Sequence, residues 1–398
     1  MVQVKVLLIT RTLAEFATLQ GKIREISKLD VRLTVVSPSC WRGSAEQVQR
    51  VEPEGYEFLP SACWFSGTRS VRLGNHLHFY PDISSVIMRE KWDLIHIDEE
   101  PFNLATFHAM RWCRKNQAPA IFSTWQNLKK KYPPPFNFFE AYVFANAAGA
   151  ISGNGEGREV LYRKGFRKPI ARIPQLGVDP GVFRKQDASD LRKKLAPEGS
   201  FLVGYVGRLH IEKGVDTLIR ALALLPSAST LVLVGRGPHR ARFERLVSEL
   251  GLSKRVKWAP WGRPTEVLEY MNAFDVLVLP SRTRSNWKEQ FGRVLVEAMA
   301  CETCVVGSDS GEIPQVIGDA GLVFREGDER ELAGHLETLM AGASLREDLG
   351  SRGRQRVFEN FTYAKIAADA VDFYRSMCRG SDRLGETAEN QLTTAGAK

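Results

Sequence analysis

The stretch FLVGYVGRLHIEKGVDTLIRALALL, residues 201–225, joins an apolar run to a segment with helical periodicity through a short polar loop. We interpret FLVGYVG (201–207) as a buried strand and the segment from Val215 to Leu225 as a helix. A strand followed directly by a helix is the repeating unit of parallel sheets that are covered by helices. This stretch therefore predicts an α/β fold.

The same alternation extends in both directions along the chain. In the second half, further strands are predicted at TLVLVG (230–235), VKWAP (256–260), DVLVLP (275–280) and CVVGSD (304–309). In the first half, they are predicted at VKVLLIT (4–10), VRLTVVSP (31–38), WDLIHID (92–98), AIFSTW (120–125) and GAISGN (149–154). The pattern predicts two Rossmann-like, doubly wound parallel sheets, one in each half.

The length of 398 residues also favours two domains, because one hydrophobic core rarely serves so long a chain. Proline and glycine in PQLGVDPGVF (174–183), followed by the charged stretch 184–194, indicate a linker with its hinge near Val178. We expect a first domain at 1–178, a second at 179–360, a last helix at 361–378 and a disordered polar tail at 379–398.

The composition excludes several classes of protein. Hydrophobic residues at 43% and charged residues at 25% are typical of globular domains. The sequence has no apolar stretch long enough to span a bilayer and no signal-peptide pattern at its start, so we expect a cytoplasmic protein, either free or at the inner face of the membrane. Six irregularly spaced cysteines fit a reducing compartment.

The net charge of +9 favours anionic partners. No zinc-finger, basic-zipper or aromatic RNA-binding signature accompanies this charge, so nucleic acid is not expected as a partner. The run from Lys129 to Lys131 precedes three prolines and Phe136. It is either an exposed polyproline turn or a site that docks on anionic lipid, helped by other basic residues of the same half: Arg111, Arg114, Lys115, Arg163, Lys164, Arg167 and Lys168.

Ligands of parallel sheets bind beyond the carboxyl ends of the strands, so we expect the chemistry there, in a cleft between the two domains. Arg208 and Lys213 leave the strand 201–207 together, just before a helix begins. Two cations at a helix start can neutralise a diphosphate, although cations in such loops are often only solvated.

A second polar segment, Glu289 to Gly292, precedes a helix that contains Glu297. If Gly292 opens this helix, both carboxylates face the same strand end and can hold hydroxyls of one extended ligand. A glycine there lets a phosphate approach the N–H groups of Phe291 and Gly292. The alternative for Glu297 is that it only solvates an amphipathic helix.

Several linked motifs between Val203 and Asp328 resemble one known family. GRLHIEKG, FDVLVLPS, EQFGRVLVEAMA and SGEIPQVIGDAGLVF are similar, in this order and spacing, to the retaining nucleotide-sugar glycosyltransferases of family 4. The resemblance covers most of the chain and implies the GT-B fold, in which two Rossmann-like domains face each other across a cleft.

The resemblance also implies roles for individual residues. Arg208 and Lys213 would clamp the donor diphosphate, Glu289 would hold hydroxyls of the transferred sugar, and Glu297 would hold the ribose. The segment around Pro260 and Trp261 would lie near the base, and the last helix would return to the first domain. The donor-binding set is Gly207, Arg208, Lys213, Glu289, Gln290, Phe291, Gly292 and Glu297, of which Arg208, Lys213 and Glu289 are the catalytic candidates.

The reaction so implied is the transfer of a hexose-type sugar, with retention, from a UDP- or GDP-sugar to an acceptor hydroxyl. The acceptor would be a sugar, a lipid-linked glycan or a phosphorylated compound, in polysaccharide or glycoconjugate biosynthesis. Neither a metal nor a cofactor is expected, because the cations stabilise the leaving diphosphate. A nucleotide-sugar epimerase and a non-catalytic nucleotide-sugar-binding protein remain as alternatives.

The first half departs from the family pattern. Thr10 to Glu15 replaces a Gly-Gly loop, and Gln126 or Asn127 stands where many members have an acceptor-side histidine. His96 is a further acceptor-side candidate, or a structural histidine, and Asp98 to Glu100 either contact substrate or form a solvated loop.

In the second half, Glu302 and Cys304 occupy positions where family members often have glycine and proline, and Cys301 and Cys304 together resemble a redox or metal pair. No second cysteine pair lies nearby in the sequence, so we do not expect a metal there.

Overall fold

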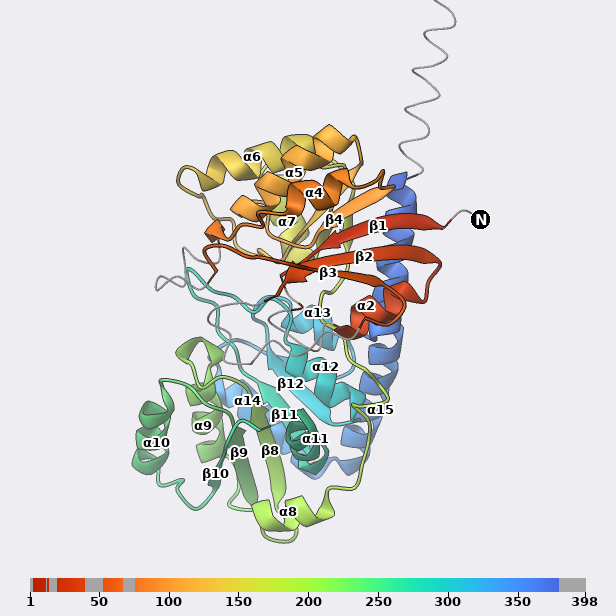
Figure 1. Cartoon of the computed structure of the whole chain (residues 1–398). Helices are drawn as coiled ribbons and strands as arrows, with labels where there is room; N and C mark the ends of the chain where they lie inside the picture. The colour runs from red at the N-terminus through yellow and green to blue at the C-terminus, as the bar shows by residue number, and fades with distance from the viewer. Residues whose placement is uncertain are drawn as a thin grey trace, which may run out of the picture. The chain divides into compact units, whose positions relative to one another are not determined.

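The chain forms two compact units in the computed structural model, which describes residues 3–11, 13, 20–39, 53–66, 76–262 and 264–378. The first unit comprises the residues up to Gln175 together with those from Tyr363 onward, and the second runs from Leu176 to Thr362. Each unit is built around its own sheet (Figure 1). The tail at 379–398, expected to be disordered, lies outside the described residues.

The sheet of the first unit has seven parallel strands in the order β3-β2-β1-β4-β5-β6-β7. The strands are β1 (Val4–Ile9), β2 (Val31–Pro38), β3 (Glu57–Ser61), β4 (Leu94–Ile97), β5 (Ala120–Thr124), β6 (Gly149–Ser152) and β7 (Ile170–Arg172). All five strands predicted here are present. Sequence patterns missed β3 and β7, which are short, only partly buried and lie at the two edges of the sheet.

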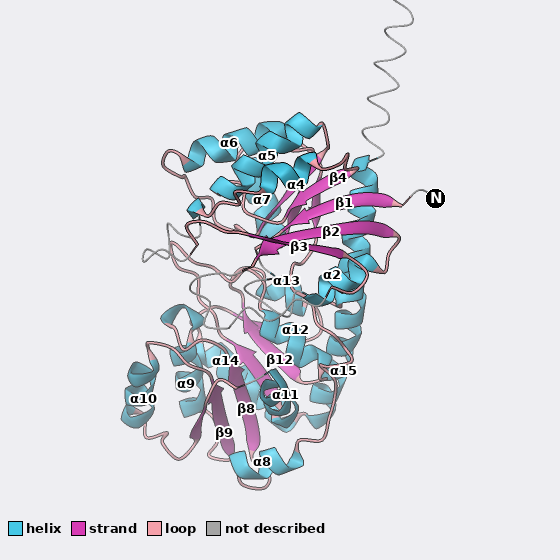
Figure 2. Ribbon diagram, in the orientation of Figure 1, coloured by secondary structure: helices cyan, strands magenta, loops and turns pink. Residues whose placement is uncertain are grey.

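Helices cover both faces of this sheet (Figure 2). They are α2 (Gln20–Ser27), α4 (Ile83–Met88), α5 (Leu104–Asn116), α6 (Phe136–Asn146) and α7 (Gly155–Arg163). A further helix at 363–378 packs Ile366, Ala370 and Tyr374 into the same core as Val6 and Leu8 of β1. The end of the chain thus contributes to the core of the unit in which the chain begins.

The second unit has six parallel strands in the order β10-β9-β8-β11-β12-β13. They are β8 (Phe201–Val206), β9 (Ser229–Val234), β10 (Val256–Ala259), β11 (Val276–Leu279), β12 (Cys304–Ser308) and β13 (Leu322–Phe324). The five predicted strands are confirmed, and the edge strand β13 was missed because it has only three residues. Both predicted parallel sheets are therefore present, and the predicted α/β fold class is confirmed.

Helical elements of the second unit flank this sheet (Figure 2). They are α8 (Ser189–Leu195), the 3-10 helix η2 (Ile211–Lys213), α9 (Val215–Leu224), α10 (Arg240–Glu249), α11 (Pro264–Ala273), α12 (Arg293–Ala300), α13 (Ile313–Ile317), α14 (Glu329–Ala341) and α15 (Ala343–Asn360).

The charged stretch that was expected to be linker contains α8, which is a correction. Leu191 and Leu195 of this helix pack on the core, and Arg192 binds Asp275 with a distance of 2.7 Å between Nη2 and Oδ2. These contacts hold a helix that has no fully buried residue of its own.

In the part of the chain that the structure describes, no helix is long and apolar enough to cross a membrane.

Candidate functional site

The strand order of the second unit defines a switch point between β8 and β11. From β8 the chain crosses to β9 on one side, and after β10 it returns to β11 on the other side. Connections that diverge in this way leave a crevice at the carboxyl ends of the two strands. Gly207 and Arg208 follow β8 there, and Pro280 and Ser281 follow β11.

Gly214 lies where the loop after β8 contacts the loop after β11. It caps α9 with a φ of 65°, in the left-handed region that favours glycine. A Cβ atom at this position would lie 1.8 Å from the carbonyl oxygen of Pro280, so no other residue fits without moving the backbone. The close approach places the neighbouring Lys213 against the loop that follows β11.

Lys213 and Glu289 form an ion pair in this position. The Nζ atom of Lys213 lies 2.6 Å from Oε2 of Glu289, and Ser281 Oγ donates to the same oxygen at 2.7 Å. The side chains of Lys213 and Glu289 are only 14% and 10% exposed, so each charge needs a partner. Lys213 therefore balances the charge of Glu289 directly, a contact that the sequence did not predict.

Arg208 lies at the same strand end with an exposed side chain. Its backbone is fixed by the buried Tyr205, whose hydroxyl donates to the Arg208 carbonyl at 2.8 Å. Burial alone would raise the pKa of Glu212, but a backbone hydrogen bond, its contact with His210 and the charge of Arg208 together lower it. Arg208 thus adds positive charge near Glu212, the residue that precedes Lys213 in the chain.

Gly292 opens α12 as predicted, with a φ of 84° at the N-cap. One face of this helix brings Glu297 into the unit, where the residue is 8% exposed and its Oε1 lies 2.6 Å from Nε of Arg293. Burial raises the pKa of Glu297, and the Arg293 charge opposes this effect. A purely solvating role for Glu297 is therefore wrong, because the carboxylate is buried and paired.

The remaining donor-side candidates differ in exposure. Phe291 is partly buried, and its ring packs on Phe361 with centroids 5.7 Å apart, whereas Gln290 is exposed. Trp261, expected near a base, is 46% exposed. The segment from Glu289 to Gly292 thus presents one buried carboxylate and a glycine backbone at the start of α12.

His96 does not fit the role of an acceptor contact, which corrects that expectation. It is completely buried in β4, where Nδ1 lies 2.8 Å from the Tyr374 hydroxyl and Nε2 lies 2.8 Å from Ser123 Oγ. Burial lowers its pKa to about 4. Both ring nitrogens are already used, so His96 is a structural histidine.

Gln126 and Asn127 lie after β5 as expected, but the Gln126 amide is occupied within the first unit. It donates to the Tyr132 hydroxyl and accepts from Lys164 Nζ at 3.0 Å. Asn127 is buried, with 8% of its surface exposed. Neither side chain is arranged as an exposed acceptor contact in this structure.

The acidic residues that follow β4 are not solvated, because Asp98 and Glu99 are buried and Glu100 is partly buried, so the solvated-loop interpretation is wrong. Glu99 is held by His78 Nε2 at 3.1 Å, by the Tyr80 hydroxyl at 3.0 Å and by Asn103 Nδ2 at 3.1 Å. Burial acts to raise the pKa of Glu99, but His78 and Arg11 outweigh it and bring the pKa to about 2. This network is a fixed structural element at the end of the sheet.

Cys301 and Cys304 do not form a pair. Cys301 lies in the core cluster that contains α11 and α12, whereas Cys304 lies in the cluster on the other face of the sheet. Burial raises the pKa of both thiols to about 12. Among the described residues, no group of three or more His, Cys, Asp and Glu side chains could hold a metal ion.

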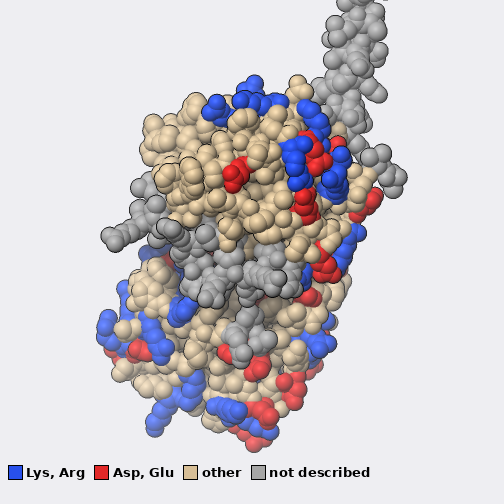
Figure 3. All heavy atoms as spheres, in the orientation of Figure 1, with Lys and Arg blue, Asp and Glu red and all other residues tan. Residues whose placement is uncertain are grey.

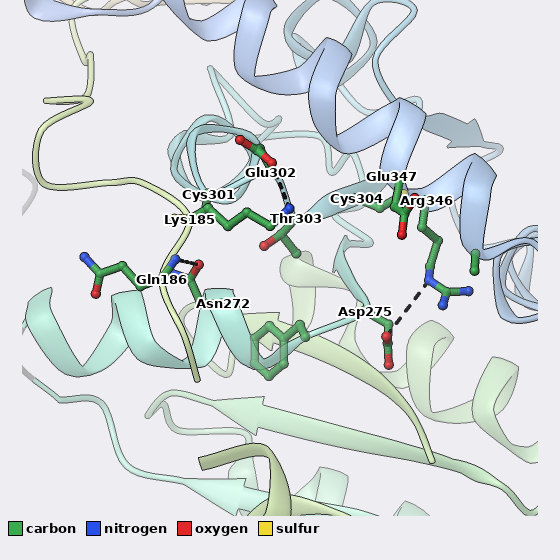
Figure 4. Close-up of a pocket in the computed structure, with 12 residues that line it drawn as sticks. Lys185, Gln186, Asn272, Asp275, Cys301, Glu302, Thr303, Cys304, Arg346 and Glu347 are labelled. Atoms are coloured by element: carbon green, nitrogen blue, oxygen red, sulfur yellow. Dashed lines mark hydrogen bonds and ion pairs between the residues drawn. The ribbon is translucent and has the colours of Figure 1, made fainter. Parts of the chain in front are cut away.

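Both cysteines border a pocket of about 290 Å³ (Figure 4). Cys304 stands at the amino end of β12, and Asp275, which also borders the pocket, stands at the amino end of β11. The pocket therefore lies at the opposite end of the sheet from Ser281. Its charged residues pair with each other, as Lys185 does with Glu302 at 3.0 Å. The pocket is therefore separate from the candidate site.

Two residues of the site were not among the predicted ones. Ser281 follows β11 directly, and the rule for strand ends could have identified it. Trp287 has no such signal, because its contact with Lys213 depends on how the loop 282–288 folds.

A comparison with known proteins identifies a family for part of the chain. Residues 187–356 match the family described as "Glycosyl transferases group 1". The matched residues all lie within the second unit.

Curated relatives match part of the chain. The N-acetyl-alpha-D-glucosaminyl L-malate synthase of Bacillus anthracis is 30% identical over 214 residues, which are 52% of this chain and 54% of that protein. The D-inositol 3-phosphate glycosyltransferase of Stackebrandtia nassauensis is 30% identical over 262 residues, which are 61% and 57% of the two chains. This chain thus matches little more than half the length of these relatives.

The fold of the chain matches solved structures along nearly its whole length. Anabaena Alr3699/HepE, solved in complex with UDP and glucose, superposes with a TM-score of 0.69 at 20% identity, over 94% of this chain and 100% of that one. At this identity the likeness establishes the fold. The expected GT-B class, with two Rossmann-like domains, is therefore confirmed.

Proposed function

We propose that this protein is a retaining glycosyltransferase that moves a hexose-type sugar from a nucleotide diphosphate sugar to an acceptor hydroxyl. The observation that carries the proposal is the cluster of Lys213, Glu289 and Ser281 at the switch point between β8 and β11. The domain match and the buried Glu297 support the same site for the donor. We further propose that the protein belongs to the retaining glycosyltransferases of family 4.

One of the similar proteins supports the choice of donor, because HepE was solved in complex with UDP and glucose. The name of a curated relative, D-inositol 3-phosphate glycosyltransferase, supports a phosphorylated compound among the acceptors. In this chain, we propose that Glu297 accepts hydrogen bonds from the ribose hydroxyls and Glu289 from hydroxyls of the sugar. A UDP- or GDP-sugar would be the donor, and glycoconjugate or polysaccharide synthesis the role.

The chemistry follows from the charges of the cluster. The bond between the anomeric carbon and the phosphate oxygen breaks, and the acceptor oxygen forms the new bond on the same face, while its proton passes to the leaving phosphate. Arg208, Lys213 and the backbone N–H groups at Gly292 stabilise the negative charge as it develops. Glu289 is engaged by Lys213 and Ser281, which favours a hydrogen-bonding role over that of a covalent nucleophile.

We further propose that the reaction needs no metal. Arg208 and Lys213 supply positive charge next to the site, as a metal ion would. Transfer that persists in excess EDTA is the expected result.

The acceptor side of the proposal includes lipid-linked compounds and peripheral contact with a membrane. Lys164 is unsuited to lipid binding, because its side chain is 8% exposed and its Nζ lies 2.7 Å from Oε1 of Glu140. The exposed cations that remain on α5 and in the loop before α6 are Arg111, Arg114, Lys115, Lys129, Lys130 and Lys131. Figure 3 shows Lys and Arg side chains along the upper edge of this unit, and Phe138 of α6 is 59% exposed.

Product analysis separates the transferase from its alternatives. The protein is incubated with UDP-glucose and other UDP- and GDP-sugars, with and without a panel of sugar and lipid-linked acceptors. A transferase releases nucleoside diphosphate when an acceptor is present, whereas an epimerase isomerises the donor without one. A binding protein does neither. Isomerised donor in the absence of acceptor would overturn the proposal.

A further inference from the structure

Trp287 lies in the loop between Ser281 and Glu289, and this loop is closed on itself. The N–H of Arg284 donates to the Trp287 carbonyl at 2.7 Å, and the N–H of Trp287 donates to the Arg284 carbonyl at 3.3 Å. These two bonds form a tight turn just before Glu289. The turn fixes the backbone of Trp287 and therefore the direction of its side chain.

The Trp287 ring faces Lys213. The Nζ atom of Lys213 lies 4.9 Å from the ring centroid, within the range of a cation–π interaction. Its second partner is Oε2 of Glu289, at 2.6 Å. The ammonium group is thus held between a carboxylate and an aromatic face.

This arrangement restricts a side chain that is otherwise mobile. Lysine carries its charge on a flexible stem with four carbons, and a single ion pair leaves several rotamers open to it. Contact with an aromatic face removes part of this freedom and shields the ion pair from water, which strengthens it. The indole is half-buried, so it can cover the pair from the solvent side.

We propose that Trp287 is a positioning residue that holds Lys213 against Glu289 through the face of its indole ring. The effect of Trp287 on catalysis rests on the proposed function, because a fixed Lys213 stabilises the leaving diphosphate without first having to be ordered. The restriction of Lys213 by Trp287 does not depend on any activity.

Two substitutions separate the aromatic contact from simple packing. Trp287→Phe keeps a smaller aromatic face, and Trp287→Leu keeps apolar bulk without one. The first readout is the rate at which an N-hydroxysuccinimide ester acylates Lys213, followed by peptide mass spectrometry. Lys185, which pairs with Glu302 far from the site, is the internal control. Circular dichroism and melting temperature establish that both variants fold.

We expect acylation of Lys213 to rise at least threefold in Trp287→Leu and to change little in Trp287→Phe, with Lys185 unchanged in both. The second readout is donor kinetics, in which Trp287→Leu lowers kcat about tenfold more than Trp287→Phe, with a smaller change in KM. Equal Lys213 acylation in the wild type and both variants overturns the inference, whatever the activity. If labelling follows the expectation but no sugar is transferred by any form, the positioning role stands and the proposed function fails.

Discussion

The hydroxyl of Tyr374 lies 2.8 Å from Nδ1 of His96, and both side chains are completely buried although 278 residues separate them in the sequence. Tyr374 belongs to the helix at 363–378, and His96 belongs to β4. The bond therefore ties the end of the chain to the centre of the first sheet. Because burial lowers the pKa of His96, we expect the stability of this unit to depend on pH.

We predict that the protein loses stability as the pH falls from 7 to 5, and that His96 causes much of this loss. Burial lowers the pKa of His96 to about 4, whereas the unfolded chain has a pKa near the ordinary 6.5. Between these values the unfolded state binds the extra proton, so the free energy of unfolding decreases as the pH falls, by about 2 kcal/mol at pH 5. Urea denaturation at the two pH values measures this change.

His96→Gln is the matched variant for this test, because glutamine can hydrogen-bond but does not titrate. Its stability at pH 7 should be lower than that of the wild type, but its loss between pH 7 and 5 should be smaller. An equal loss in both proteins would exclude His96 as the source.

The ion pair of Lys213 and Glu289 predicts a non-additive effect on stability. Lys213→Met leaves the Glu289 carboxylate nearly buried without its cation and should cost about 3 kcal/mol. The double variant Lys213→Met/Glu289→Gln removes both charges and should be more stable than Lys213→Met alone. Denaturation of the two single variants and the double variant measures the coupling.

The same substitutions should reduce sugar transfer. Each removes a group that the proposed reaction uses, so kcat should fall about a hundredfold in each single variant. The double variant regains stability but not activity. Recovery of activity in the double variant would mean that the pair is structural only.

Cys301 and Cys304 are predicted to be inert in the folded protein. They are 3% and 2% exposed, and burial raises the pKa of each thiol to about 12, so little reactive thiolate is present at neutral pH. Labelling with iodoacetamide followed by mass spectrometry should modify them only after unfolding. Rapid labelling of either cysteine in the native protein contradicts this prediction.

Binding to anionic vesicles tests the lipid surface. Replacing Lys129, Lys130 and Lys131 by alanine should lower co-sedimentation with vesicles that contain phosphatidylglycerol, because each cation contributes about 1 kcal/mol near such a surface. The matched control removes three exposed lysines of the second unit, Lys193, Lys194 and Lys254. Equal binding of the wild type and the Lys129–Lys131 variant would exclude this part of the surface.

The sequence predicted ten of the thirteen described strands, most of which have a buried apolar run that ends in a polar loop. The short strands β3, β7 and β13 escaped this pattern, since they are edge strands with few buried residues. Gly292 could be predicted as the start of a helix because glycine is suited to the left-handed backbone found there.

The partners of individual side chains could not be predicted in the same way. His96 looked accessible at a strand end, but Tyr374 comes from a distant segment and buries it. Lys213 and Glu289 were both predicted as site residues, but their direct contact depends on the close approach of Gly214 to Pro280. Contacts between distant segments of this kind are set by the tertiary structure and have no local signal.

The most direct test of the donor site is thermal stabilisation by UDP, GDP and ADP, measured on the wild type and on Glu297→Ala. We predict that UDP or GDP raises the melting temperature of the wild type and that Glu297→Ala, although folded, loses most of this shift. Stabilisation that is the same in both proteins would place the nucleotide elsewhere. No stabilisation of the wild type by any of the three nucleotides, or by their sugar conjugates, would contradict the proposed function.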